Sequence, residues 1–304
     1  LDQATFFFEK KFSETPEALR YLSSRGLAEA TIKEWRIGYA PLDWRQLHDF
    51  LLDKGFTKTE LEKVGLIKKS DKREGEHYDV FRGRITFPIF DQSGKVIAFS
   101  GRILVDDGKS PKYLNTPETA LFNKSETLYG LHKAKVDIRR KDYSILVEGQ
   151  MDLVMSHQAG FGNTVASSGT AFTEAHLKKL QRLSNRIIMA FDADGAGFAA
   201  ANKSAVLALS LGMEVKIAPL LKGSDPAELI KTNINAYSGA LKNSLHIIDF
   251  YVRSLVAQKL DSRVMGKEIQ AKVLPYINML QSSIERSHFV SKVARIMGIK
   301  EEAV

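Results

Sequence analysis

The sequence contains no cysteine, which excludes disulfide bonds and thiolate-bound metal ions within its 304 residues. The seven histidines are scattered without the short spacing of zinc ligands, so we expect no zinc in this chain. Long apolar runs are also missing, since the best candidate, residues 205–213, is far shorter than the roughly 18 residues that a membrane span needs. We therefore expect neither a disulfide scaffold nor a membrane protein.

What remains is the composition of an ordinary globular protein with a basic balance. The chain is 44% hydrophobic and 26% charged, and its length allows two or three compact units. The net charge of +8 favours a polyanionic partner such as nucleic acid, but many enzymes are equally basic. Because the chain begins at Leu1 rather than methionine, we expect it to be an excised part of a longer protein.

The amino-terminal part, residues 1–141, is predicted to be an α+β subdomain. Short helices are expected up to about residue 70, and one of them begins with a capping box formed by Thr57 and Glu60. Residues 80–103 then contain two β-rich runs around a Gln-Ser-Gly turn, which predicts a hairpin.

The middle part, residues 142–240, alternates between strand and helix patterns. The expected strands are YSILVEG, NTVASS, RIIMAFD and EVKIAPL, and helical sequences follow the first three. Repeated units of this kind predict an α/β fold with a mostly parallel sheet flanked by helices. Residues 241–304 return to a helical pattern and are predicted to form a helical carboxy-terminal subdomain.

Four carboxylates follow the predicted strands of the middle part. Glu148 lies in VEGQMD, Asp192 and Asp194 lie in FDADGAG, and Asp225 lies in GSDPAE. The carboxyl ends of parallel strands meet at one edge of a sheet, so these side chains are expected to converge on a hard divalent cation such as Mg²⁺. The alternative for any one of these acids is a helix cap.

Two other chemistries compete for the paired aspartates. The GAGFAA segment fits a dinucleotide-binding loop, but Asp192 and Asp194 would repel the pyrophosphate, and Glu214 starts a strand instead of ending one. A site similar to that of haloacid-dehalogenase-like phosphohydrolases would use Asp192 as nucleophile and Asp194 as acid. However, Ala196 stands where that family has Thr or Val, and VEGQMD would have no role.

The order E-G-x-x-D, D-x-D-x-x-G and D-P resembles the Toprim domain of primases, topoisomerases and some nucleases. Further motifs resemble bacterial DnaG-type primases in particular, over nearly the whole chain. They are RGL at 25–27, IGYAP at 37–41, FRGRITFPI at 81–89, SGR at 100–102, PKYLNTPET at 111–119, LFNKSETLYG at 121–130 and SSGTAFT at 167–173.

The resemblance implies roles for individual residues. Glu148, Asp192 and Asp194 match catalytic metal ligands, and Asp225 matches an acid near a second metal, so two Mg²⁺ or Mn²⁺ ions are expected. Asp152 is expected to support a metal ligand, with a helix cap as the alternative. The matching basic and polar positions for template and nucleotides are Arg102, Lys112 and Lys124, followed by Arg25, Arg84 and Asn115.

The implied function is a DNA-templated RNA polymerase that makes short RNA primers on single-stranded DNA. Its partners would be the template, NTPs, the RNA primer and, through a carboxy-terminal domain absent here, a replicative helicase, in the bacterial cytoplasm near the nucleoid. The alternatives are a phosphohydrolase and a non-catalytic nucleic-acid-binding fragment. Two departures stand out: the family's zinc-binding domain is missing, and Ala227 replaces the second acid of the usual D-P-D motif.

Overall fold

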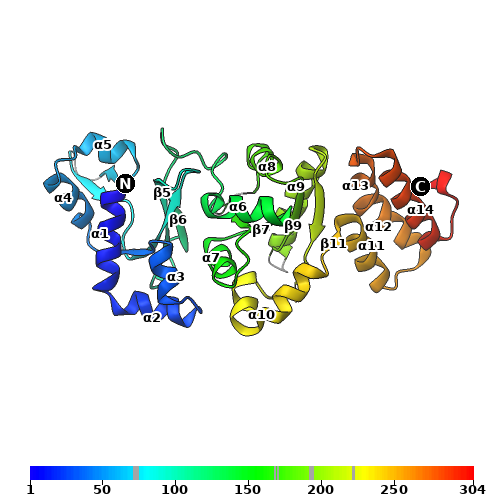
Figure 1. Cartoon of the computed structure of the whole chain (residues 1–304), viewed down its shortest axis with the longest axis horizontal. Helices are drawn as coiled ribbons and strands as arrows, with labels where there is room; N and C mark the ends of the chain where they lie inside the picture. The colour runs from blue at the N-terminus through cyan, green and yellow to red at the C-terminus, as the bar shows by residue number, and fades with distance from the viewer. Residues whose placement is uncertain (71–74, 168, 170, 192–194, 221–222) are drawn as a thin grey trace. The chain divides into compact units, whose positions relative to one another are not determined.

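The computed structural model describes residues 1–70, 75–167, 169, 171–191, 195–220 and 223–304, with the backbone alone for 195–200. The chain forms two compact units (Figure 1). Unit 1 comprises Leu1–Lys135 and Glu148–Thr170, and unit 2 comprises Val136–Val147 and Ala171–Val304. The division predicted above at residues 142 and 241 stays a prediction.

Unit 1 is an α+β structure built on an antiparallel sheet in the order β1-β4-β5-β6, as predicted for the amino-terminal part. Its elements are α1 (Asp2–Ser13), α2 (Pro16–Ser24), α3 (Glu29–Glu34), β1 (Gly38–Ala40), α4 (Gln46–Asp53), α5 (Lys58–Lys63), β2 (Ile67–Lys69), β3 (His77–Asp79), β4 (Arg84–Phe90), β5 (Val96–Ile103), β6 (Tyr113–Asn115), the first part of α6 (Leu131–Lys141), α7 (Gln150–Gln158) and β8 (Thr164–Ala166).

The hairpin of β4 and β5 is confirmed, and so is the capping box at the start of α5. The backbone N–H of Glu60 donates to Thr57 Oγ1 at 3.3 Å, and the Thr57 N–H donates to Glu60 Oε2 at 2.8 Å. Phenylalanine rings fix α1 against the hairpin, since the buried rings of Phe8 and Phe99 meet edge to face at 5.2 Å. Burial of such large rings is a main source of folding free energy in this unit.

A second buried cluster anchors α7 within unit 1. Trp35 is 1% exposed, and its ring centroid lies 5.7 Å from that of Tyr129 and 5.0 Å from that of His157. Gln158, the last residue of α7, accepts from the Ala28 N–H at 2.8 Å and donates to the Gly26 carbonyl at 2.9 Å. These contacts hold α7 against the segment that follows α2.

Unit 2 contains a mostly parallel sheet and a helical carboxy-terminal part. Its elements are the end of α6, β7 (Ser144–Val147), α8 (Glu174–Gln181), β9 (Arg186–Met189), α9 (Gly195–Ser210), β10 (Glu214–Ile217), α10 (Pro226–Lys242), β11 (Leu245–His246), α11 (Ile247–Ala257), α12 (Ser262–Lys272), α13 (Leu274–Met279), α14 (Ser283–Met297) and a final 3-10 turn (Glu301–Ala303). β9 pairs in parallel with both β7 and β10, and β11 adds an antiparallel edge to β10.

This architecture agrees with the predicted order of strands and helices, with one local difference. The Leu245–His246 pair, which the helical pattern had included, forms the edge strand β11 because its backbone bonds to β10. The helix pattern after it is confirmed, and α14 ends at Gly298 with a φ of 65°. No helix among the described residues is long and apolar enough to span a bilayer.

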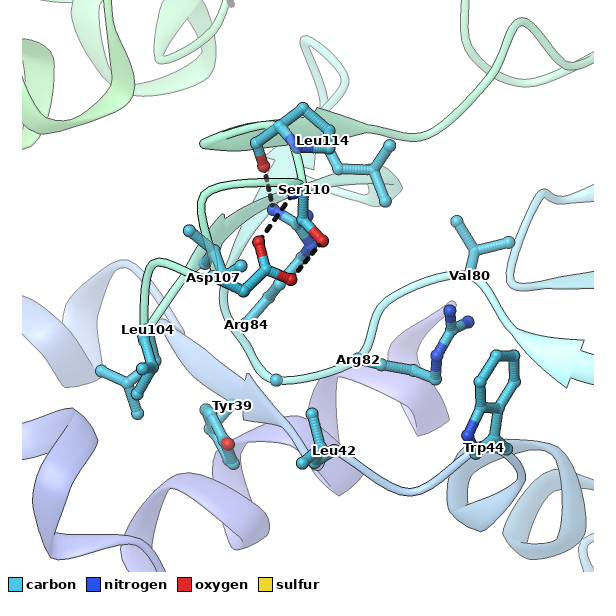
Figure 2. A pocket seen from close by; sticks show the side chains of 14 residues that line it. Tyr39, Leu42, Trp44, Val80, Arg82, Arg84, Leu104, Asp107, Ser110 and Leu114 are labelled. Carbon is cyan, nitrogen blue, oxygen red and sulfur yellow. Dashed lines mark hydrogen bonds between the residues drawn. The ribbon is translucent and has the colours of Figure 1, made fainter.

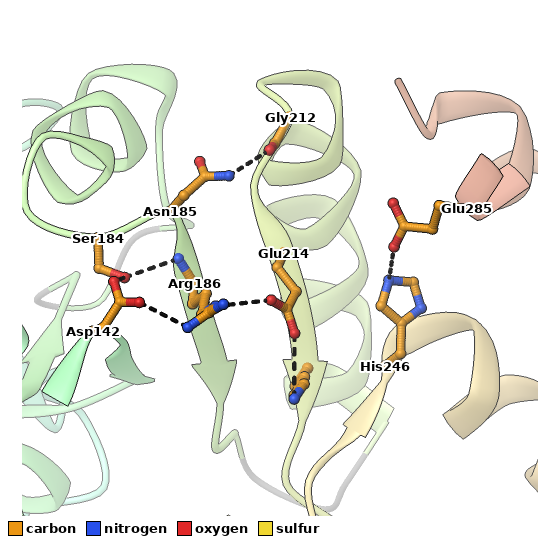
Figure 3. A network of polar contacts seen from close by, with 9 residues as sticks. Asp142, Ser184, Asn185, Arg186, Gly212, Glu214, His246 and Glu285 are labelled. Atoms are coloured by element: carbon orange, nitrogen blue, oxygen red, sulfur yellow. Dashed lines mark hydrogen bonds and ion pairs between the residues drawn. The ribbon is translucent and has the colours of Figure 1, made fainter. Parts of the chain in front are cut away.

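A polar network fastens the amino ends of the parallel strands in unit 2 (Figure 3). Arg186 opens β9 and pairs with Asp142 Oδ2 at 2.7 Å and with Glu214 Oε2, at the start of β10, at 3.1 Å. His246 accepts from the Ile248 N–H at 3.3 Å. Charges that tie neighbouring strand starts together leave the opposite, carboxyl edge as the place for ligands.

Candidate functional site

The predicted metal ligands fall at different kinds of position. Glu148 directly follows β7 and is half-buried, as expected for an acid at the carboxyl end of a strand. Asp192 and Asp194 lie outside the described residues. Asp225 is the N-cap of α10, and its Oδ1 accepts from the Glu228 N–H at 2.6 Å. This contact gives Asp225 the capping role that was the alternative for each acid.

Asp152 and Ala227 lie close in sequence to the predicted metal ligands, and the structure shows what each side chain contacts or fills. Asp152 Oδ2 accepts from the Gly149 N–H at 3.2 Å, so it does cap α7. Ala227 is 2% exposed within the first turn of α10, which leaves no open side chain at the place of the usual second acid. Within the described ranges, no three His, Asp or Glu side chains come together in a group able to hold a metal ion.

In unit 1, the antiparallel sheet brings several of the predicted basic and polar residues onto one face. Arg102 on β5 lies directly opposite Tyr113 on β6, and Ser100 lies opposite Asn115. Side chains alternate along a strand, so Arg102, Tyr113 and Asn115 share this face, which we call the Arg102 face. The guanidinium Nη1 of Arg102 donates to the Tyr113 hydroxyl at 2.8 Å.

Helix α2 brings a further side chain to the Arg102 face. The guanidinium carbon of Arg102 lies over the ring of Tyr21 from α2, 5.1 Å from its centroid, and over that of Tyr113 at 5.4 Å. Arg25 is the C-cap of α2, four residues after Tyr21. Burial raises the pKa of Tyr113, although the charge and the hydrogen bond of Arg102 oppose the rise, so Tyr113 stays a neutral phenol.

The other predicted positions differ in their exposure and surroundings. Lys112 is exposed and immediately precedes β6. Lys124 is half-buried, and its backbone N–H donates to Glu118 Oε1 at 3.0 Å. A Cβ placed on Gly169 would lie 3.7 Å from Asn115 Nδ2, so Gly169, which follows β8, lies close to β6.

Arg84 is placed differently, on the opposite face of the same sheet. It is 5% exposed, and its Nη1 donates to the carbonyls of Gly101 at 3.1 Å, Pro111 at 2.9 Å and Lys112 at 3.4 Å. Burial lowers the pKa of its guanidinium. These contacts favour a role in positioning the segment before β6 over direct contact with a ligand.

A pocket of about 640 Å³ opens on this opposite face, which we call the pocket face (Figure 2). Its walls combine apolar and cationic groups, and the lining side chains include Tyr39, Leu42, Trp44, Val80, Arg82, Arg84, Ile103, Leu104, Asp107 and Leu114. One rim is the turn after β5, where Asp107 accepts from the Ser110 N–H at 2.7 Å and the Lys109 N–H at 3.0 Å. These bonds lower the pKa of Asp107 to about 2.

An exposed tryptophan and an arginine form the other rim of the pocket. Trp44 is 60% exposed, and the guanidinium carbon of Arg82 lies 4.1 Å from the centroid of its ring and 5.0 Å from that of Tyr78. Arg82 Nη1 also donates to the Asp79 carbonyl, and the Asp79 N–H donates to the Trp44 carbonyl at 2.8 Å. A flat aromatic surface beside a fixed cation suits a base and its phosphate.

Sequence reasoning missed Tyr21, Trp44 and Arg82. Arg82 lies in the same FRGR motif as Arg84. The motif therefore predicted the correct segment, but the residue named was Arg84, whereas Arg82 forms the rim beside Trp44. The exposure of Trp44 depends on tertiary packing and left no signal in the pattern.

Comparisons with known proteins agree on the relatives of both units. A family model described as the DNA primase catalytic core, N-terminal domain, matches residues 6–135, and a Toprim-like model matches residues 145–230. The chain is 37% identical to the DNA primase of Clostridium acetobutylicum over 309 residues, which cover 99% of this chain and 50% of that protein. The chain thus spans about half the length of this curated relative.

Solved structures give the same answer. The RNA polymerase domain of Mycobacterium tuberculosis primase DnaG matches with a TM-score of 0.85 and 30% identity, covering 97% of this chain and 96% of that one. A DnaG primase catalytic domain solved bound to single-stranded DNA matches with a TM-score of 0.83 and 31% identity, covering 100% of this chain and 96% of that one.

Proposed function

This chain belongs to the DnaG-type DNA primase family as a catalytic core with a Toprim domain, and on that premise we propose that it synthesises short RNA primers on single-stranded DNA. The observation that carries the proposal is a match over nearly the whole chain, in sequence and fold, to primase RNA polymerase domains. The full-length protein would work in the bacterial cytoplasm and contact a replicative helicase through a domain outside this chain.

The acids provide a donor set that fits Mg²⁺. Glu148, Asp192, Asp194 and Asp225 offer only carboxylate oxygens, the ligands that hard divalent cations prefer. Two bound ions would lower the pKa of the attacking 3′-hydroxyl and stabilise charge on the α-phosphoryl group as pyrophosphate leaves. Ala227 brings no oxygen to this set, so the remaining acids would hold the ions without help from that position.

The two faces of the unit 1 sheet suit different parts of the nucleic acid. We assign phosphate contacts to Arg102 on the Arg102 face, and further contacts with template or nucleotides to Lys112, Lys124, Arg25 and Asn115. On the pocket face, Trp44 offers a stacking surface for a template base, and Arg82 beside it offers a cation for the backbone. Arg84 holds the segment that carries Lys112 in place.

A primer-synthesis assay tests the proposal. The protein is incubated with single-stranded template, labelled NTPs and Mg²⁺ or Mn²⁺, and template-dependent oligoribonucleotides are expected. Asp192→Asn should abolish synthesis because it removes a charge that holds metal, and Glu148→Gln should bind DNA nearly as well as the parent but fail to extend. Hydrolysis of phosphate monoesters without primer synthesis, lost in Asp192→Asn, would instead support a phosphohydrolase.

A further inference from the structure

We propose that Tyr21 and Tyr113 form an aromatic clamp that fixes the guanidinium of Arg102 in one orientation for a phosphate group of the template or of an incoming nucleotide. Tyr21 and Tyr113 thereby act as positioning residues. This inference rests on the proposed function, because it assigns the orientation of a side chain that the function requires.

The clamp is assembled from three elements that the fold brings together. Arg102 comes from β5, Tyr113 from the directly opposite position on β6, and Tyr21 from α2. The guanidinium carbon lies 5.1 Å from the Tyr21 ring centroid and 5.4 Å from the Tyr113 ring centroid. Both distances are within the range of a cation–π contact, and a planar guanidinium stacks on aromatic rings where a lysine ammonium does not.

Contacts with aromatic rings do not use up the N–H groups of the guanidinium as hydrogen-bond donors. One N–H, on Nη1, donates to the Tyr113 hydroxyl at 2.8 Å, which sets the rotation of the group. The Nε of Arg102 is buried without a hydrogen-bond acceptor among the described residues. A buried unpaired donor is costly, and because solvent does not reach Nε, we assign the phosphate contact to the Nη N–H groups of this half-buried side chain.

The ring of Tyr21 matters to this arrangement and its hydroxyl does not. The Tyr21 hydroxyl oxygen is buried and has no hydrogen-bond partner within the described part of the chain. Replacing it by hydrogen therefore removes no contact, whereas replacing the ring removes one wall of the clamp. Tyr113 differs, because its hydroxyl accepts the Arg102 N–H, so both its ring and its hydroxyl contribute.

Equilibrium binding tests the clamp without relying on synthesis. Labelled oligodeoxythymidylate is titrated in EDTA, and ATP is titrated separately with Mg²⁺, for the parent, Tyr21→Leu, Tyr21→Phe, Tyr113→Phe and Arg102→Ala. Tyr21→Leu is expected to lose about 3- to 10-fold in affinity, the scale of one cation–π contact, and Tyr21→Phe should restore most of that loss. The DNA arm responds if the ligand is the template backbone, and the ATP arm responds if it is a triphosphate.

A double-mutant cycle decides whether the tyrosine acts through the arginine. In the Arg102→Ala background, Tyr21→Leu should cause no further loss, because the group that it orients is gone. Losses that add independently, or a Tyr21→Phe protein as weak as Tyr21→Leu with unchanged unfolding in urea, would overturn the clamp. A parent protein that binds neither DNA nor ATP would overturn the proposed function itself, which is a distinct result.

Discussion

The two faces of the β1-β4-β5-β6 sheet use arginine in opposite ways. On the pocket face, Arg84 is buried and its Nη1 bonds to backbone carbonyls of the chain itself. On the Arg102 face, the guanidinium lies over the rings of Tyr21 and Tyr113, and its Nε is buried without an acceptor among the described residues. Two arginines on adjacent strands of one hairpin therefore have different surroundings, and we expect Arg84 to support the structure and Arg102 to contact a ligand.

The difference follows from what each arginine finds around it. Three backbone carbonyls accept from Arg84 Nη1, so removing this side chain would break three bonds that hold β5 and the segment before β6. Aromatic rings near Arg102 hold its position but accept few hydrogen bonds, so its donors stay available. We therefore expect the partners of a basic side chain, more than its sequence motif, to indicate whether it contacts a ligand.

The largest effect is expected on the free energy of unfolding when Arg84 is replaced. Arg84→Ala should lower the free energy of unfolding by about 3–5 kcal/mol, because it removes the bonds from Nη1 to three carbonyls and leaves a cavity in place of a buried side chain. Urea unfolding followed by circular dichroism measures this loss. A stable Arg84→Ala protein with strongly weakened DNA binding would show that Arg84 contacts the ligand directly.

A second prediction concerns the pH dependence of stability, because Asp79, whose carbonyl accepts from Arg82 at the pocket rim, has a buried carboxyl group. Burial raises the pKa of Asp79 from 3.8 to about 7, and the N–H groups of Leu47 and His48, each 2.9 Å from a carboxylate oxygen, oppose that rise. A folded-state pKa above the unfolded value means that stability is greatest below pH 4 for this group and is lost as pH rises through 7.

We expect this group to reduce the free energy of unfolding by about 3–4 kcal/mol between pH 4 and 7.5. Asp79→Asn should flatten the dependence over the same window, which urea unfolding at several pH values will measure. Identical pH profiles for the two proteins would show that Asp79 does not titrate in this range.

In contrast to Arg84, replacement of Arg102 should weaken ligand binding and leave the free energy of unfolding nearly unchanged. Arg102→Ala is expected to weaken single-stranded DNA or nucleotide binding by about 10- to 100-fold, the loss of one charge-assisted hydrogen bond, with little change in unfolding. The slope of log affinity against log salt should fall by about 0.7 for single-stranded DNA if one phosphate contact is lost. Unchanged affinity and slope would remove Arg102 from the binding surface.

The smallest effect is expected on the pocket rim. Trp44→Ala should weaken single-stranded DNA binding by about 5- to 10-fold through loss of base stacking, and Trp44→Phe should lose less. Fluorescence anisotropy of a labelled oligonucleotide measures both. Because Trp44 is exposed, stability should stay near that of the parent, and a large loss of stability would indicate a structural role instead.

Local signals predicted much of the fold because they act over a few residues. The capping box of Thr57 and Glu60, the β4–β5 hairpin and the alternation of strands and helices in unit 2 all follow from such signals. The edge strand β11 was not predicted because two residues are too few to show the alternation of apolar and polar side chains that is typical of a strand. Only its pairing with β10 defines it.

The candidate site was predicted less completely, for a geometric reason. Arg102 was identified from its motif, but its contact with Tyr21 joins a helix and a strand about eighty residues apart, which no local pattern encodes. Likewise, the burial of Arg84 follows from the register that places it opposite Ile103, and register is a property of two strands together. Asp192 and Asp194 remain predictions from the sequence.

The two tryptophans of the chain occupy contrasting environments, and this has an optical consequence. Trp35 is 1% exposed, whereas Trp44 is 60% exposed beside the Arg82 guanidinium. A water-soluble quencher such as iodide should therefore reach the indole of Trp44 and spare that of Trp35. The intrinsic fluorescence of the unlabelled protein divides into a constant buried component and a quenchable one, and the second reports directly on whatever covers the pocket rim.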